Sequence, residues 1–141
     1  FEAAAFLRRA GADTAEVKRL FQNDLEGTIA KYDIIQNAKM YHEGIAVAKV
    51  DHTVGRITAA QAADELLNIS GIDTSFVLFP DQEGRVILSA RSMGDVNVQV
   101  VLEKLGGGGN AATAGAQVPG KGGDEVNDML LQAIDAYLEE E

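Results

Sequence analysis

The sequence predicts an α/β (α+β) fold: a mixed β-sheet covered by helices and preceded by a helical linker. Helical periodicity fills the first forty residues. Downstream, short apolar runs typical of strands alternate with amphipathic segments in the order β-α-β-β-α-β-α, which favours helices packed on a sheet. With 46% hydrophobic and 24% charged residues, the 141-residue chain has the composition of a globular domain.

The first forty residues contain two predicted helices. Residues 2–10 form the first, which ends at Gly11 because glycine tolerates the left-handed conformation beyond a helix end. Asp13 and Thr14 give a second start signal, after which apolar residues recur at helical spacing towards Ala38.

The remaining elements follow from residue 45 onward. The turn sequence over residues 80–84 lies between two apolar runs and predicts a hairpin. Strands are expected at residues 45–50, 75–79, 86–90 and 114–118. Helices are expected at residues 58–70, from near 95 to 105, and at 126–137.

Charge and cysteine content exclude several functions. The net charge of -10 argues against broad affinity for nucleic-acid phosphates. Seven acids and no base lie from Asp124 onward, leaving 15 acids against 12 bases upstream, so a local site for one small anion remains open. The absence of cysteine excludes disulfides, thiolate zinc sites and cysteine nucleophiles, and it is typical of a cytoplasmic chain.

A run of four glycines, Gly106 to Gly109, is the most unusual local feature. Nine of the 15 glycines lie between residues 94 and 123. Without Cβ atoms, the backbone of the run can approach a ligand closely and direct N–H groups at phosphate oxygens. A flexible linker is the alternative interpretation.

Arg91 is the most informative single side chain. It follows the strand predicted at residues 86–90, and its planar guanidinium can grip a phosphate through two nitrogens or stack on a base. The alternative is an ordinary exposed arginine at a strand end.

Other motifs give weaker evidence of function. Residues 115–121 read G-x-x-x-x-G-K, but Gly122 lacks the hydroxyl that would hold Mg²⁺ in a phosphate-binding loop. Asp51 and His52 could both ligate a metal, yet no further ligands cluster near them in the sequence. No apolar run approaches the ~18 residues of a membrane span. We therefore assign no catalytic residue, no metal ligand and no membrane contact to this chain.

Residues 89–100, the glycines at 106–109 and residues 114–117 together resemble one known constellation. It is that of the C-terminal, DHH-associated domain of DHH-family phosphoesterases, and it is most similar to the bacterial membrane-anchored cyclic di-AMP phosphodiesterases. The likeness covers nearly the whole chain. It implies a helical linker from the catalytic DHH domain at residues 1–41 and a substrate-binding domain at residues 42–141.

The resemblance implies a hydrolase that cleaves cyclic di-AMP or short oligonucleotides. Two Mn²⁺ ions and the attacking water would belong to the DHH domain of the same chain, outside this sequence, so we expect the isolated fragment to be inactive. The fragment would lie in the cytoplasm, and the parent protein would carry a membrane anchor elsewhere in its chain. The substrate-binding residues implied are Arg91, Ser92, Gly107, Gly108, Gly109 and Asn110.

One position departs from the family pattern. The family's glycine loop ends in histidine, where this sequence has Asn110. Asparagine can donate and accept hydrogen bonds, but it cannot become cationic or deliver a proton. A catalytic role for residue 110 is therefore in doubt.

Two other functions stay open at this point. The chain could be a non-catalytic module that binds nucleotides or single-stranded nucleic acid, which steep salt dependence would reveal. It could also be a structural or dimerisation domain whose glycines only turn the chain, and homodimer formation is left open.

Overall fold

The computed structural model describes residues 14–140, so the helix expected at residues 2–10 and its end at Gly11 lie outside the described residues. The chain forms two units, residues 1–30 and residues 31–141. The sheet and the helices that cover it belong to the second unit.

Helix α2 begins at Thr14, as predicted, and ends at Gln36. The prediction that the helix continues to Ala38 and that residues up to 40 are helical is wrong, because Ala38–Met40 form strand β1. This strand pairs antiparallel with β2, and Lys39 lies opposite Val47. Pairing with a distant strand outweighs the local helical pattern here.

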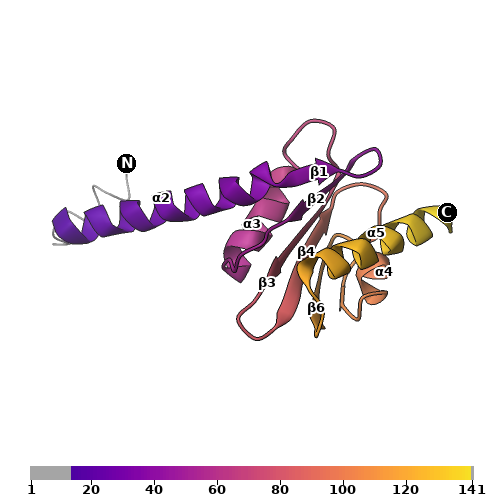
Figure 1. Cartoon of the computed structure of the whole chain (residues 1–141). Coiled ribbons are helices and arrows are strands. Elements are labelled where there is room, and N and C mark those ends of the chain that lie inside the picture. Colours follow the sequence, from indigo (N-terminus) through magenta and orange to yellow (C-terminus); the bar gives the residue numbers. More distant parts are fainter. Residues whose placement is uncertain (1–13, 141) are drawn as a thin grey trace. The chain divides into compact units, whose positions relative to one another are not determined.

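The described residues form a six-stranded sheet in the order β1-β2-β3-β4-β6-β5 (Figure 1). Strands β2 and β3 are parallel, and every other neighbouring pair is antiparallel. This mixed sheet confirms the predicted fold class. The further strands are β2 (Ile45–Lys49), β3 (Thr74–Pro80), β4 (Arg85–Ser92), β5 (Gly108–Gly109) and β6 (Thr113–Pro119).

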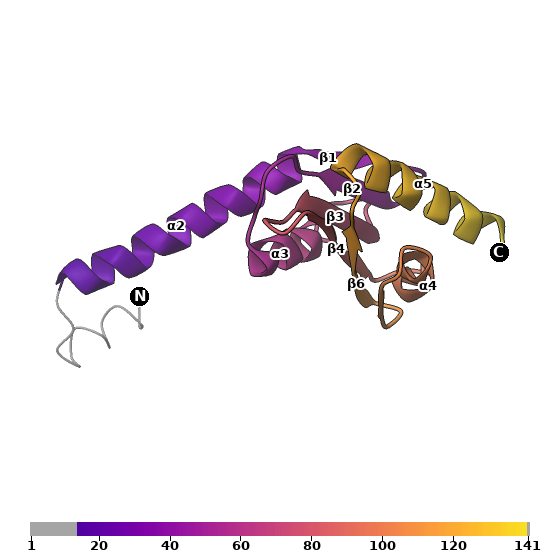
Figure 2. The ribbon, with the colours of Figure 1, turned by 60° about the horizontal axis from the view of Figure 1, so that its bottom comes forward.

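Three helices pack on the two faces of this sheet. Helix α3 connects the parallel strands β2 and β3, and it lies on one face, whereas α5 lies on the other (Figure 2). Helix α4 packs on the α5 side through the same apolar cluster. The bounds are α3 (Arg56–Leu66), α4 (Val98–Glu103) and α5 (Gly123–Glu139).

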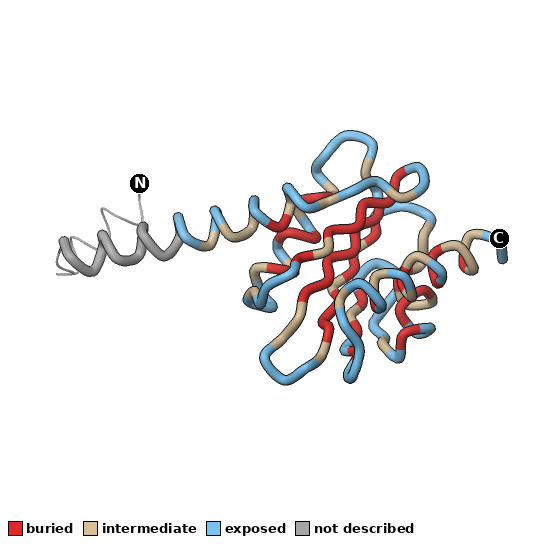
Figure 3. The backbone as a smooth tube through the Cα atoms, viewed as in Figure 1, coloured by how far each residue is buried: buried red, intermediate tan, exposed pale blue. Residues whose placement is uncertain are grey.

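Alternation along the strands builds two apolar cores. On β3, Phe76 and Leu78 face the α4 and α5 side, and Val77 and Phe79 face α3. All four side chains are buried, as expected for a central strand covered on both faces. Buried residues, drawn red in Figure 3, accordingly run through the middle of the sheet.

Helix α3 covers only part of its face. From β4, its apolar cluster includes Ile87, and it includes no residue of β6. On β6, the buried residues Ala114, Ala116 and Val118 point to the α4 and α5 side, so Gly115 and Gln117 face the uncovered part. Among the described residues, no helix has the length and apolar character needed to cross a bilayer.

Candidate functional site

An open groove of about 550 Å³ lies on the part of the sheet that α3 leaves uncovered. Its walls come from the first residue of α3, the middle of β4, strand β6 and the glycine loop, by which we mean Gly106 to Gly109. The lining includes Arg56, Ser89, Gly106, Gly107, Gly108, Gly115 and Gln117.

The glycines of the loop have different structural requirements. A Cβ on Gly107 would lie 2.3 Å from the carbonyl oxygen of Gly115, and one on Gly109 would lie 2.3 Å from that of Thr113. These two glycines are needed for the close approach to β6. A Cβ on Gly108 would meet nothing within 4 Å. Gly108 lies opposite Gly115 in the sheet, and the pair gives the groove a floor of bare peptide groups.

Two N–H groups of the loop already have partners within the fold. The N–H of Gly106 donates to the carbonyl of Glu103 at 3.1 Å, and that of Gly107 to Leu102 at 2.8 Å. These bonds satisfy carbonyls that the end of α4 would otherwise leave unpaired. The expectation that the Gly107 N–H is aimed at a ligand oxygen is therefore wrong.

Asn110 shapes the turn that leads from the loop into β6. Its Oδ1 accepts hydrogen bonds from the backbone N–H groups of Ala112 and Thr113, both at 2.9 Å. Its own N–H donates to the carbonyl of Thr113 at 2.7 Å. The residue is exposed, and no hydrogen bond of its Nδ2 occurs among the described residues. Asn110 thus uses its oxygen for the fold and keeps its amide hydrogens for solvent or a ligand.

Arg91 lies on the same face of β4 as Ser89, two residues further along the strand. Its Nε donates to Oδ1 of Asp64 on α3 at 2.9 Å, and its Nη1 donates to the carbonyl of Ala90 at 2.9 Å. These contacts fix the guanidinium beside α3 while the side chain remains 17% exposed. The remaining nitrogen, Nη2, has no hydrogen bond within the described structure.

Ser92 lies on the opposite face of β4 from Arg91. Ala90 is buried on the α4 and α5 side, and Ser92, two residues further along the strand, points to the same side. Ser92 is 7% exposed. Its hydroxyl accepts the N–H of Gly94 at 3.3 Å. The structure therefore does not bring Ser92 together with Arg91 and the groove.

Part of the motif at residues 89–100 has a structural role. Oδ1 of Asn97 accepts the N–H groups of Gln99 at 3.1 Å and Val100 at 3.3 Å, which caps the start of α4. Gly94 passes so close to Asp73 that a Cβ would lie 2.9 Å from the carboxylate. These residues position the helix that carries the glycine loop.

Sequence reasoning missed Arg56. This residue begins α3 and lines the groove together with the glycine loop, although about fifty residues separate them along the chain. No acid among the described residues pairs with it. Only the packing of α3 on the sheet brings this cation to the loop, and no local sequence signal indicates it.

The described residues contain no group of three or more His, Asp or Glu side chains able to hold a metal ion. Asp51 pairs with Lys49 at 2.8 Å, and His52 contacts Asp33 at 3.2 Å. The groove likewise offers no carboxylate: its polar lining is Arg56, Ser89, Gln117 and backbone groups, a set that does not suit a divalent cation.

Comparison with known proteins places most of the chain in one family. Residues 42–140 match the DHHA1 domain, and the chain belongs to the DHHA1 domain family. The resemblance predicted from residues 89–117 is confirmed.

Two curated relatives show the likeness over nearly the full chain. The cyclic-di-AMP phosphodiesterase PdeA of Listeria monocytogenes is 39% identical over 139 residues, which is 97% of this chain and 21% of the relative. The cyclic-di-AMP phosphodiesterase GdpP of Geobacillus thermodenitrificans is 41% identical over 141 residues, or 99% of this chain and 21% of the relative. The chain thus spans about a fifth of the length of these relatives.

Solved structures share the fold at lower identity. An exopolyphosphatase-related protein from Bacteroides fragilis aligns with a TM-score of 0.70 at 20% identity, covering 95% of this chain and 42% of that one. The C-Ala domain of alanyl-tRNA synthetase from Aquifex aeolicus aligns with a TM-score of 0.55 at 18% identity, covering 67% of this chain and 96% of that one.

Proposed function

We propose that this chain is the substrate-binding domain of a Mn²⁺-dependent phosphodiesterase that hydrolyses cyclic di-AMP or short oligonucleotides. The observation that carries the proposal is the open groove in which Arg56 and the glycine loop meet, with Arg91 beside it on the same face. The family and the phosphodiesterase activity of the relatives support it.

The groove suits a nucleotide that carries both charge and flat rings. Arg56 and the free Nη2 of Arg91 can donate hydrogen bonds to phosphate oxygens. The planar guanidinium group suits phosphate because its N–H groups match the spacing of two phosphate oxygens. The floor formed by Gly108 and Gly115 has no side chains, so a planar base can lie directly on the peptide groups. The Nδ2 of Asn110 adds a neutral donor at the end of the loop.

Chemistry would require the rest of the parent protein. The described residues do not fit a metal site, so the Mn²⁺ ions that supply an activated water are assigned to the DHH domain of the same chain. This domain would hold the substrate against that centre on the cytoplasmic side of a membrane-anchored parent. Asn110 cannot act as a proton donor there, and its role would be binding.

Calorimetric titration of the 141-residue chain with cyclic di-AMP and with linear di-adenylate tests the proposal. We expect saturable binding that Arg91→Ala weakens at least tenfold, while Lys104→Gln, which removes a cation paired with Glu140 outside the groove, leaves it unchanged. The same variants in the intact enzyme should raise KM and leave Mn²⁺ binding unaltered. If KM for both nucleotides is unchanged in Arg91→Ala, the groove is not the substrate site.

A further inference from the structure

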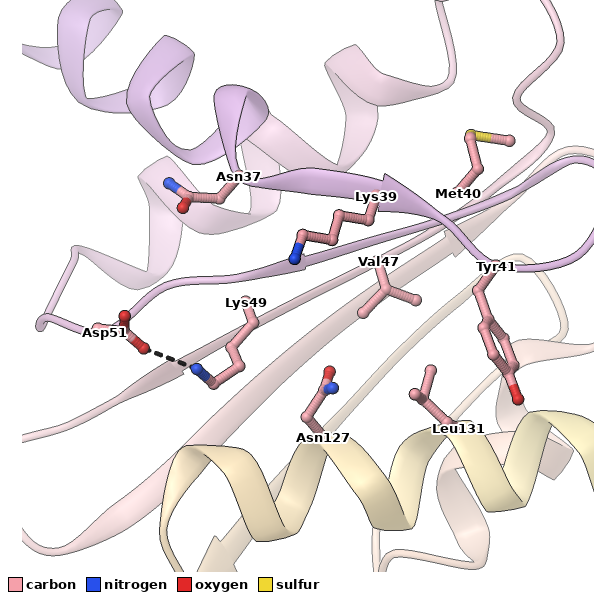
Figure 4. A pocket seen from close by; sticks show the side chains of 9 residues that line it. All are labelled: Asn37, Lys39, Met40, Tyr41, Val47, Lys49, Asp51, Asn127 and Leu131. Carbon is pink, nitrogen blue, oxygen red and sulfur yellow. Dashed lines mark hydrogen bonds and ion pairs between the residues drawn. The ribbon is translucent and has the colours of Figure 1, made fainter.

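A second pocket lies between the edge strands of the sheet and helix α5 (Figure 4). Its volume is about 340 Å³, within the range of small-molecule sites. Lys39 and Lys49 enter it from β1 and β2, and Asn127 and Leu131 enter it from α5. Val47 points from β2 toward α5, on the Tyr41 side of the two lysines.

Asn127 has no evident structural purpose at this position. Its Oδ1 is buried, and no hydrogen-bond partner for it exists among the described residues. An unpaired buried acceptor is costly, and asparagine is also a poor residue for a helix interior. A rotation of the side chain would present this carboxamide to a molecule in the pocket, which would then satisfy it.

The two lysines give the pocket a cationic side. Within the described structure Lys39 has no ion-pair partner. Lys49 pairs with Asp51 at 2.8 Å and with Asp124 at 2.7 Å, but those carboxylates are 84% and 93% exposed. Exposed ion pairs contribute little to stability, so an anion can replace either carboxylate on Lys49 at small cost.

The rest of the lining combines two polar side chains, Asn37 and Asp51, with an apolar side made by Met40, Tyr41, Val47 and Leu131. Val47 is buried, and Tyr41 donates its hydroxyl to Oδ2 of Asp135 at 2.7 Å, which holds its ring at the end of the pocket. Leu131 completes this side. A flat ring fits against such a surface, because aromatic and branched aliphatic side chains pack well on ring faces.

We propose that this pocket binds a small heteroaromatic anion carrying a hydrogen-bond donor, of the class of a nucleoside monophosphate. Lys39 and Lys49 hold the anionic group, Asn127 hydrogen-bonds the ring, and Val47, Tyr41 and Leu131 cover its face. The pocket lies on the α5 side of the sheet, opposite the glycine loop, and is therefore separate from the groove of the proposed function.

The test is a titration of the 141-residue chain with adenosine 5′-monophosphate, followed by calorimetry and by backbone amide NMR shifts. We expect saturable binding with shifts at Lys39, Val47 and Asn127 rather than at Gly108 and Gly115. Adenosine, which lacks the phosphate, should bind at least tenfold more weakly, and added salt should weaken binding of the monophosphate.

Variants separate this pocket from the groove. Lys39→Gln should weaken binding about tenfold, whereas Lys104→Gln should not. Asn127→Leu should abolish binding and raise the melting temperature, since it removes an unpaired buried oxygen. Gly108→Val, which fills the groove, should leave binding intact.

Two results would overturn the proposal. The first is the absence of adenosine monophosphate binding at millimolar concentration. The second is binding that Gly108→Val removes and Lys39→Gln does not, which would place the nucleotide in the groove and support the proposed function instead. Failure of the proposed function would give a different result: dinucleotide binding would be unchanged in both Arg91→Ala and Gly108→Val.

Discussion

Gly107 packs on Gly115 so closely that a Cβ on Gly107 would lie 2.3 Å from the carbonyl oxygen of Gly115 and 2.6 Å from the Cβ of Ala116. The backbone contact between the glycine loop and β6 therefore excludes any side chain at residue 107. Its neighbour Gly108 has open space on the groove side. The loop thus combines a residue required for packing with one available to a ligand.

This difference predicts opposite effects for two small substitutions. Gly107→Ala should lower the free energy of unfolding by about 3 kcal/mol, because the backbone of β6 must move to admit the methyl group. Gly108→Ala should change it by less than about 0.5 kcal/mol, yet weaken dinucleotide binding. Urea unfolding and calorimetric titration measure the two effects. Equal stability of the two variants would contradict the packing argument.

The ion pair between Arg91 and Asp64 should affect binding more than stability. Asp64→Asn removes the charge that orients the guanidinium, but Asp64 is 62% exposed, so we expect a loss below about 1 kcal/mol in unfolding free energy. The affinity for cyclic di-AMP should fall severalfold in Asp64→Asn and further in Arg91→Lys, which lacks the planar fork. If Arg91→Lys binds cyclic di-AMP as tightly as the unsubstituted chain, Arg91 does not contact phosphate through two nitrogens.

Arg56 supplies the second cation of the groove. Arg56→Gln should weaken dinucleotide binding about tenfold and reduce its salt dependence, because one fewer charge contacts the phosphates. Lys121→Gln is the matched control, since Lys121 pairs with Glu125 at 3.0 Å and does not line the groove. The slope of affinity against salt concentration distinguishes a direct phosphate contact from a general effect of net charge, which both variants alter equally.

Asn97 should matter through the helix that it caps. Asn97→Ala removes the acceptor for two N–H groups of α4 and should cost about 1 kcal/mol in unfolding free energy. Asn97→Asp retains an acceptor and should restore most of the loss. Amide exchange of the glycine loop should accelerate in Asn97→Ala, because α4 leads directly into it. Unchanged exchange there would show that β6 alone holds the loop.

The contact of Tyr41 and His42 with Asp135 predicts a pH dependence of stability. Hydrogen bonds from the Tyr41 hydroxyl at 2.7 Å and from His42 at 2.7 Å lower the pKa of Asp135, and the same carboxylate raises the pKa of Tyr41. The folded protein therefore binds the Asp135 proton less tightly than the unfolded chain, whose aspartate pKa is about 3.9. The stabilisation is present above that pH and is lost as the pH falls through the lower, folded value.

Asp135→Asn checks this relationship. The variant should unfold at lower urea concentration than the parent sequence at pH 7, and the difference should shrink as the pH approaches about 2. Glu139→Gln on the same helix serves as the control. A difference that stays constant over this pH range would mean that ionised Asp135 does not stabilise the fold.

The sequence indicates the larger elements because their signals are local. Short apolar runs predict the strands around Val47, Val77 and Leu88, and helical spacing predicts α5. Strand β5 has no such signal, because two glycines have low strand propensity. It is a strand only because Gly107 and Gly109 allow a close approach to a segment that follows later in the chain.

The same reasoning separates the site residues. Arg91 and the glycines could be singled out by residue type and position, whereas Arg56 reaches the groove through the path of α3 across the sheet. The resemblance groups Ser92 with Arg91 as a binding residue, whereas β4 extends to Ser92 in the structure and its alternation places the two side chains on opposite faces. Whether these residues bind substrate remains a prediction.

The order of strands has a consequence for how the groove forms during folding. Strand β5 precedes β6 in the chain, yet β6 lies between β4 and β5 in the sheet. A chain emerging from the ribosome therefore has no partner for Gly108 until Thr113–Pro119 has followed. The floor of the groove, which Gly108 and Gly115 form together, can therefore be completed only after β6 has been synthesised, and a nucleotide bound there would slow the separation of β6 from β5.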